Sequence, residues 1–142
     1  MKFTKATNYA LHTMLALVAA SPVKPVGVQQ LADSQGVSPT YLSKILTRLV
    51  KAGMIESVSG ANGGYRVSRK KDDITFLDII HAIEGSASLF ECDFVHGDEC
   101  LIQAAMKEAE EKMELHLKNT KLVDLAQKQT QVYGEPIPVE GK

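Results

Sequence analysis

Residues 28–53, VQQLADSQGVSPTYLSKILTRLVKAG, carry the strongest structural signal in this 142-residue sequence. The apolar periodicity of residues 28–34 predicts a short helix, and Gly36 supplies the tight turn that follows it. Ser38 and Pro39 suit the N-cap and first position of a second helix, because the hydroxyl accepts an unpaired N–H there and proline loses no hydrogen bond. The stretch therefore predicts a helix-turn-helix.

The two faces of the second helix differ in chemistry. One face is apolar, with side chains three and four positions apart: Leu42, Ile45, Leu46 and Leu49. The other face carries hydroxyls, an aromatic ring and cations: Thr40, Tyr41, Ser43, Lys44, Thr47, Arg48 and Lys51. Such groups bind phosphates and the edges of bases. The second helix is therefore predicted to pack its apolar face inward and to present its polar face to double-stranded DNA.

Charge is distributed unevenly along the chain. Residues 1–71 contain ten basic and two acidic side chains, a net charge of +8, whereas residues 72–142 contain six basic and fifteen acidic ones, a net charge of −9. A positive half that faces a polyanion, with an acidic half facing away, suits a DNA-binding protein. The alternative is that the asymmetry serves only solubility.

Length and composition limit the remaining classes. A chain of 142 residues predicts one domain with an appended helix. No apolar run is long enough to span a bilayer, and the N-terminus does not have the pattern of a signal peptide, so we expect a cytoplasmic protein without a membrane partner. The motifs of hydrolases, zinc proteases, dinucleotide-binding enzymes and Cys-x-x-Cys redox enzymes are missing from the sequence, so we expect no enzymatic activity.

A glycine-rich β-hairpin is expected directly after the helix-turn-helix. Residues 54–58 and 65–68 have the pattern of two strands, joined by SGANGG. Asn62 and Gly63 are the strongest hairpin signal in this segment, because both residue types accept positive φ. A helix-turn-helix followed by a hairpin predicts a mainly α, winged helix-turn-helix fold.

Further helices are predicted on either side of this unit, over residues 4–20, 76–84 and 121–129. Thr75 and Asp78 match a capping box for the helix over residues 76–84. Thr120 is the expected cap of the last helix. The chain is thus divided into a winged helix-turn-helix region, a sensor loop, a pair of C-terminal helices and a disordered tail, over residues 1–84, 85–99, 100–130 and 131–142.

A long helix predicted over residues 100–119 has a narrow apolar seam. Ile102, Met106, Ala109 and Met113 follow the 4-3-4 spacing of a helix pair. Because helix-turn-helix proteins usually read two half-sites as symmetric dimers, this helix is predicted to form a homodimer interface. Packing within its own chain is the alternative.

Several segments, in order along the chain, resemble the Rrf2 family of winged-helix regulators. They are FTKATNYAL at residues 3–11, SPTYLSKIL at 38–46, SGANGGYRVSR at 59–69 and ITFLDIIHAIEG at 74–85, followed by a cysteine pair and KLVDLA. The resemblance spans about residues 2–130. It implies a bacterial, dimeric transcription factor, and repression is the simplest action for a small dimer that blocks polymerase.

The resemblance implies that the helix-turn-helix enters the major groove of DNA and that the hairpin reaches the minor groove. The residues expected to contact DNA from the helix-turn-helix are Ser38, Pro39, Thr40, Tyr41, Lys44 and, at the DNA backbone, Arg48. Those expected from the hairpin are Ser59, Gly60, Asn62, Gly63, Gly64, Tyr65 and Arg66. Many relatives have an arginine where this chain has Ser59, and Arg66 or Arg69 is expected to replace part of that charge.

The resemblance also implies a sensing function, since several members sense iron–sulfur status, nitric oxide, redox state or cysteine metabolism. Cluster-binding relatives typically have three cysteines. Cys92 and Cys100 match the first two, whereas the third position falls on Met106. One hypothesis is therefore a [2Fe–2S] cluster on Cys92, Cys100 and one or two non-cysteine ligands such as His12 of a second protomer, a mixed ligation that raises the reduction potential.

Other hypotheses for the cysteine pair remain open. A disulfide between Cys92 and Cys100 is a second possibility, in which a thiol switch shifts the dimer helix. A position near a helix N-terminus favours the thiolate of Cys100, although the neighbouring acids oppose it. A metal site with His96 is a third hypothesis and needs a fourth ligand. A fourth is that both cysteines are inert, and a winged helix that binds another protein is the rival function.

Overall fold

The structure, a computed structural model, describes residues 3–20, 24–68, 71–91 and 100–133. The elements in these ranges are α1 (Lys5–Ala19), α2 (Val28–Gln35), α3 (Pro39–Lys51), β1 (Ile55–Val58), β2 (Gly64–Val67), the 3-10 turn η1 (Lys71–Asp73), α4 (Phe76–Glu84), α5 (Leu101–Lys118) and α6 (Leu122–Tyr133). The expected mainly α fold with one hairpin is confirmed. In the described part of the chain, no helix is both long and apolar enough to cross a membrane.

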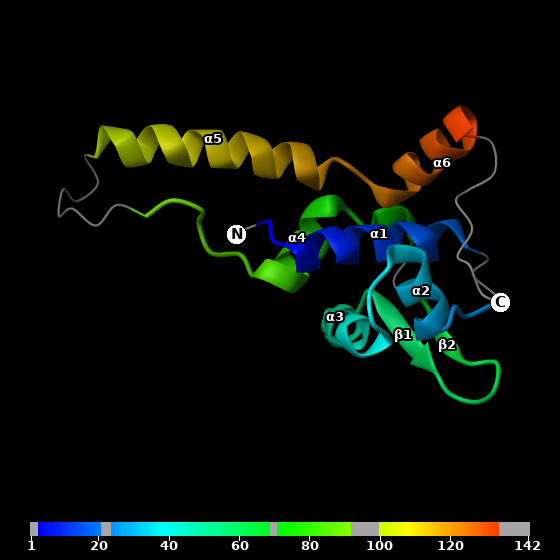
Figure 1. The fold of residues 1–142 in the computed structure, drawn as a ribbon. Helices are drawn as coiled ribbons and strands as arrows, with labels where there is room; N and C mark the ends of the chain where they lie inside the picture. The colour runs from blue at the N-terminus through cyan, green and yellow to red at the C-terminus, as the bar shows by residue number, and fades with distance from the viewer. Residues whose placement is uncertain (1–2, 21–23, 69–70, 92–99, 134–142) are drawn as a thin grey trace.

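Helix α1 lies at the centre of the molecule (Figure 1). It contacts α2, α3, α4, α6 and β2, and its Ala10 and Met14 have no exposed surface. The apolar faces of the other helices of this body close around it, with Leu31, Leu46 and Leu122 also fully buried. The core therefore joins the N-terminal helices to α6, far along the chain.

The helix-turn-helix forms as its sequence predicts. Gly36 ends α2 with a φ of +68°. The hydroxyl of Ser38 accepts the Tyr41 N–H at 3.1 Å, and Pro39 is the first residue of α3. The four apolar residues predicted to face inward from this helix are all buried: Leu42, Ile45, Leu46 and Leu49.

The hairpin is confirmed, but its turn is not the one expected. The register pairs Val58 with Gly64, so five residues form the loop. The turn is closed by the Gly63 N–H, which donates to the Gly60 carbonyl at 3.0 Å. Positive φ occurs at Gly60 and Gly64, not at Asn62 and Gly63, so the prediction for the Asn-Gly pair was wrong. A five-residue loop places Asn62 inside a turn whose central residues have negative φ.

The base of the hairpin is fixed to the body by a short bridge. Tyr65 and Val26 exchange two backbone hydrogen bonds, of 2.8 and 2.9 Å. Gly64 has a φ of +149°, and a Cβ there would lie 2.5 Å from the Val26 carbonyl oxygen. A Cβ on Gly63 would lie 2.0 Å from the Val58 carbonyl oxygen. Glycine is therefore required at both positions by close approach of the chain's own backbone.

Helices α4 and α6 begin side by side. The capping box of α4 is confirmed, with Thr75 and Asp78 bonded reciprocally. The Leu122 N–H at the start of α6 donates to the Ile74 carbonyl at 3.1 Å. Thr120 does not cap α6 as expected, because α6 begins two residues later and the Thr120 hydroxyl donates to the His116 carbonyl of α5. Helix α6 runs to Tyr133, so three residues assigned to the disordered tail are helical, and residues 134–142 lie outside the described ranges.

Helix α5 contacts the body through α4 and extends beyond the other helices (Figure 1). Along its 18 residues, all of which the structure describes, Glu110 is the one buried side chain. The predicted seam is largely uncovered, with Ile102 68% exposed and Met106 44% exposed. Leu101 and Leu115 are exposed as well. The described part of a single chain thus leaves the apolar residues of α5 largely uncovered.

Candidate nucleic-acid interface

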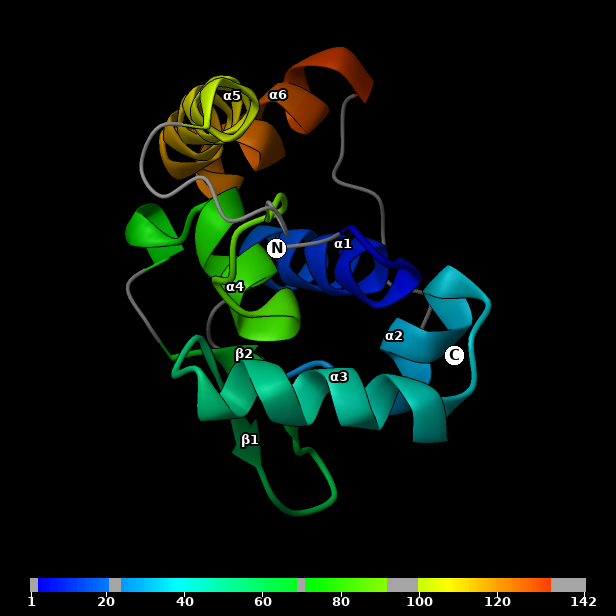
Figure 2. The same ribbon diagram turned by 90° about the vertical axis from the view of Figure 1, so that its left-hand side faces the viewer.

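Helix α3 and the wing, the hairpin of residues 55–67, lie on the same side of the molecule (Figures 1 and 2). Helices α5 and α6 lie on the opposite side in both views. This arrangement separates the cationic face of α3 from the acidic side chains of α5 and α6. A polyanion could therefore approach α3 and the wing together, far from the acidic side chains of α5.

The first turns of α3 present an ordered polar surface. Thr40 and Lys44 are exposed, and Tyr41 is 39% exposed. The Tyr41 ring meets the Tyr9 ring of α1 edge to face, with centroids 5.8 Å apart. Such a contact restricts the ring of Tyr41 while its outer part stays in solvent. The predicted residues from Ser38 to Lys44 are thus brought together at the N-terminal end of α3.

Arg48 is an exposed residue whose guanidinium is bound to α4 by one hydrogen bond. Its Nη1 donates to the Ile83 carbonyl at 3.1 Å, in the last turn of α4. Carbonyls at a helix C-terminus carry partial negative charge, so a guanidinium is stabilised there. The prediction that Arg48 contacts the DNA backbone did not foresee this bond, which couples α3 to α4.

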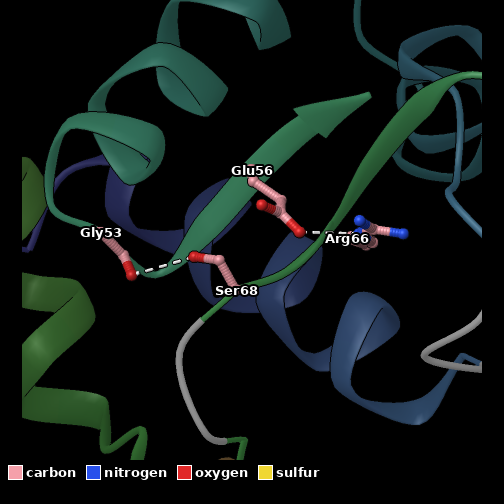
Figure 3. Close-up of polar contacts among 4 residues, drawn as sticks. All are labelled: Gly53, Glu56, Arg66 and Ser68. Atoms are coloured by element: carbon pink, nitrogen blue, oxygen red, sulfur yellow. Dashed lines mark hydrogen bonds and ion pairs between the residues drawn. The ribbon is translucent and has the colours of Figure 1, made fainter. Parts of the chain in front are cut away.

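The wing tip and the wing strands differ in charge. Ser59, Gly60 and Asn62 are exposed at the tip, where they could approach a groove. Arg66 does not lie at the tip. Its Nε forms an ion pair of 2.7 Å with Glu56, the residue opposite it in the hairpin (Figure 3). The expectation that Arg66 replaces the missing tip cation is therefore not supported, because Glu56 compensates its charge, and Arg69 lies outside the described residues.

The end of β2 is also fastened to the turn after α3. The Ser68 hydroxyl donates to the Gly53 carbonyl at 3.1 Å (Figure 3). The Ser68 N–H donates to the Met54 carbonyl at the same distance. These two bonds hold the base of the wing against the C-terminal end of α3. They therefore fix the position of the wing relative to α3.

The predicted sensor residues are only partly described. Cys92 and His96 lie outside the described residues. Cys100 is half-buried and is the N-cap of α5, where its Sγ accepts the Gln103 N–H at 3.4 Å. The described contact of the Cys100 sulfur is therefore with the backbone at the N-terminus of α5.

His12 lies elsewhere, on the exposed side of α1. It lines a cavity of about 250 Å³ with Leu15, Phe76 and Leu125. Cys100 begins α5 at the end that projects away from this body (Figure 1). Among the described residues there is no group of three or more His, Cys, Asp or Glu side chains that could hold a metal ion. The described residues of one chain therefore do not form a cluster site.

Two carboxylates with structural roles were missed by the sequence analysis. Glu84 accepts hydrogen bonds from the Thr4 N–H, the Thr4 hydroxyl and the Thr7 hydroxyl, at 2.9, 2.5 and 2.6 Å. Glu110 accepts from the Ser88 hydroxyl at 2.6 Å and the Leu89 N–H at 2.8 Å. These two donors hold the pKa of Glu110 below its ordinary value of 4.5. Both acids bind residues distant in sequence, so no local pattern could have indicated them.

Comparison with known proteins agrees with this geometry. Residues 3–128 match the family model of Rrf2, described as an iron-dependent transcriptional regulator. The chain is 38% identical over 115 residues to protein aau3 of Rhizobium meliloti, covering 77% of this chain and 74% of that protein. It is 30% identical over 133 residues to the HTH-type transcriptional regulator IscR of Klebsiella pneumoniae, covering 91% and 82%.

The fold is also similar to that of a solved relative. CymR, the global cysteine regulator of B. subtilis, superimposes with a TM-score of 0.80 at 28% identity, covering 90% of this chain and 98% of that one. The family match over most of the chain agrees with the winged helix-turn-helix seen in the fold. This chain belongs to the Rrf2 family of winged-helix, DNA-binding transcriptional regulators.

Proposed function

We propose that the chain binds double-stranded DNA as a homodimer and represses transcription by blocking polymerase. Helix α3 enters the major groove with Thr40, Tyr41 and Lys44, and the wing tip around Asn62 approaches the minor groove. The observation that carries this proposal is the exposed polar face of α3, which lies beside the wing and opposite α5. Such a regulator acts where the chromosome lies, which places it in the cytoplasm.

The surface of α5 supports the homodimer. Its seam residues Ile102 and Met106 are exposed in the single chain, and the seam has the spacing of a helix pair. A symmetric dimer would bury the same seam from both chains and would place two copies of α3 on two half-sites of DNA. The opposite placement of α5 and α3 leaves the DNA-binding face free in such a dimer.

The DNA-binding proposal is tested by selecting binding sequences from random duplex DNA and comparing two lysine variants. Lys44→Ala is expected to weaken binding to the selected sequence and to lower the magnitude of the salt slope by about 2, because the proposed homodimer loses two phosphate contacts, one from each copy of α3. Lys128→Ala removes an exposed charge from α6 on the far side and is the matched control. Equal affinities for wild type and Lys44→Ala would refute the placement of α3. A protein–protein module is instead expected to select no sequence and to bind DNA weakly.

For the signal, we propose a cysteine-based response centred on Cys100, with Cys92 as its partner. Support comes from the placement of Cys100 at the N-terminus of the long α5, where oxidation of its sulfur would alter the cap of the proposed dimer helix. The second hypothesis is a [2Fe–2S] cluster that Cys92, Cys100 and His12 of another protomer would hold.

Anaerobic purification followed by visible absorption and analysis of iron, sulfide and zinc separates these hypotheses. Iron and sulfide in equal amounts, with bands that vanish in Cys92→Ala, would establish the cluster and refute the thiol switch. A colourless, metal-free protein whose DNA affinity changes on oxidation, but not in Cys100→Ser, would establish the thiol switch. A metal-free protein that does not respond to oxidant would show that the cysteines are inert.

A further inference from the structure

The carboxyl-terminal end of α4 meets both α3 and α1. The Ile83 carbonyl accepts the Arg48 guanidinium of α3 at 3.1 Å. The next residue, Glu84, accepts the backbone N–H and hydroxyl of Thr4 and the hydroxyl of Thr7, at the start of α1. A carboxylate at a helix N-terminus is favoured by the helix dipole. Two consecutive residues at the end of α4 thus form hydrogen bonds with both α3 and α1.

The segment that follows α4, residues 85–89, forms hydrogen bonds with α5. Gly85 ends α4 with a φ of +81°, and Ser88 and Leu89 follow closely. Both residues donate hydrogen bonds to the carboxylate of Glu110. The Ser88 hydroxyl donates at 2.6 Å, and the Leu89 N–H donates at 2.8 Å. Glu110 is only 8% exposed, on a helix whose other side chains are exposed or half-buried.

The bonds of Glu110 to residues 88–89 and the bond of Ile83 to Arg48 are separated by only a few residues of backbone. Glu110 fixes where residues 88–89 lie on α5, and that position limits where the end of α4 can lie. The end of α4 in turn provides the carbonyl that orients Arg48, and with it α3. A shift of α5 would therefore reach α3 through hydrogen bonds and covalent chain, without a contact between the two helices being needed.

We propose that Arg48 and Glu110 are positioning residues for DNA recognition, which together transmit the placement of the proposed dimer helix α5 to the recognition helix α3. The inference rests on the proposed placement of α3 in the major groove. In this role the Arg48 guanidinium acts through the Ile83 carbonyl rather than through a DNA phosphate. Glu110 acts through the segment that follows α4 and touches neither DNA nor α3.

A double-mutant cycle on the full chain tests this coupling. The variants are Glu110→Gln, Arg48→Met and the double variant, and the readout is affinity for the selected DNA duplex by fluorescence anisotropy. Glutamine keeps the size of the side chain but offers one acceptor oxygen where the structure uses two, so one of the two charge-assisted hydrogen bonds is lost or replaced by a weaker amide–hydroxyl bond. Glu110→Gln is expected to weaken binding by roughly 3- to 30-fold in the wild-type background, the usual range for a coupling residue. In the Arg48→Met background its effect is expected to fall below about twofold, because the receiving bond is already lost.

Two further readouts distinguish positioning from other roles. Glu111→Gln makes the same change of charge at an exposed neighbour and is expected to leave affinity unchanged. Arg48→Met is expected to retain the wild-type salt slope, whereas loss of a phosphate contact from each protomer of the proposed dimer would lower the magnitude of that slope by about 2. Additive effects of the two variants, an equal effect of Glu111→Gln, or a lowered salt slope in Arg48→Met would each overturn the inference.

Hydrogen exchange measures the same path without DNA. In Glu110→Gln, the amides of residues 85–89 and of the last turn of α3 are expected to exchange faster than in the wild type. Faster exchange confined to residues 85–89 would contradict transmission to α3. If instead Lys44→Ala leaves DNA affinity unchanged, the proposed role of α3 fails on its own account, which separates that failure from a failure of the coupling.

Discussion

Glutamate in place of Ile102 is expected to weaken the homodimer. Ile102 lies on the predicted seam of α5 and is 68% exposed in the single chain. Complete burial of an isoleucine side chain contributes roughly 1.5–3 kcal/mol. About two thirds of that contribution is still available at Ile102, and a symmetric dimer buries the residue twice.

Removing this contribution therefore costs about 2–4 kcal/mol per dimer, before the added cost of placing two carboxylates in the interface. Since each 1.4 kcal/mol is a factor of ten, the dimer Kd is expected to rise roughly 30- to 1,000-fold. Analytical ultracentrifugation over a range of protein concentrations measures this Kd directly.

Ala104→Glu is the matched control, because it adds the same charge on an exposed position of the same helix, on the face that carries Glu108 and Lys112. Its Kd is expected to stay close to that of the wild type. An unchanged Kd for Ile102→Glu, or an equal loss in both variants, would refute the assignment of the seam as the dimer interface.

Three further outcomes follow from individual contacts. Ser38→Ala removes the N-cap of α3 and is expected to lower the free energy of unfolding by about 1 kcal/mol in urea denaturation. Gly64→Ala is expected to cost at least 1–3 kcal/mol by the same measurement, because of its φ of +149° and the nearby Val26 carbonyl, whereas Gly27→Ala, with no atom within 4 Å of the new Cβ, is expected to cost far less. Because the pKa of Glu110 is lowered, its contribution to stability is present above pH 4.5 and is lost as the pH falls through the lowered pKa. In Glu110→Gln, the free energy of unfolding measured in urea is therefore expected to fall less steeply below pH 4.5 than in the wild type.

Local patterns were enough to predict the winged helix-turn-helix. The cap at Ser38, the apolar spacing from Leu42 to Leu49 and the capping box at Thr75 each depend on residues a few positions apart, and each is confirmed. The Asn-Gly signal predicted a hairpin correctly but not its turn, because strand register placed five residues in the loop. Tyr65, just after that loop, is also paired with Val26, a contact that a local pattern does not contain.

The hydrogen bonds and ion pairs of the side chains on α3 and the wing could not be predicted from local patterns. Arg48 was assigned to DNA from its place on the polar face of α3, yet one of its donors is used by Ile83, 35 residues away. Arg66 was expected to supply charge to the wing tip, but the hairpin register sets it opposite Glu56. In each case the partner is known only once the chain is folded, because the partners of a polar side chain depend on which elements pack together.

The salt dependence of wild-type binding to the selected duplex tests the central claim most directly. A dimer that presents two copies of α3 and two wings to DNA is expected to neutralise roughly 6–10 phosphates, so its affinity is expected to fall by about 10³–10⁵ between 50 and 200 mM salt. Affinity for an unrelated duplex of the same length is expected to be much weaker at every salt concentration. A shallow salt dependence, or equal affinity for both duplexes, would contradict the proposal that α3 and the wing read DNA.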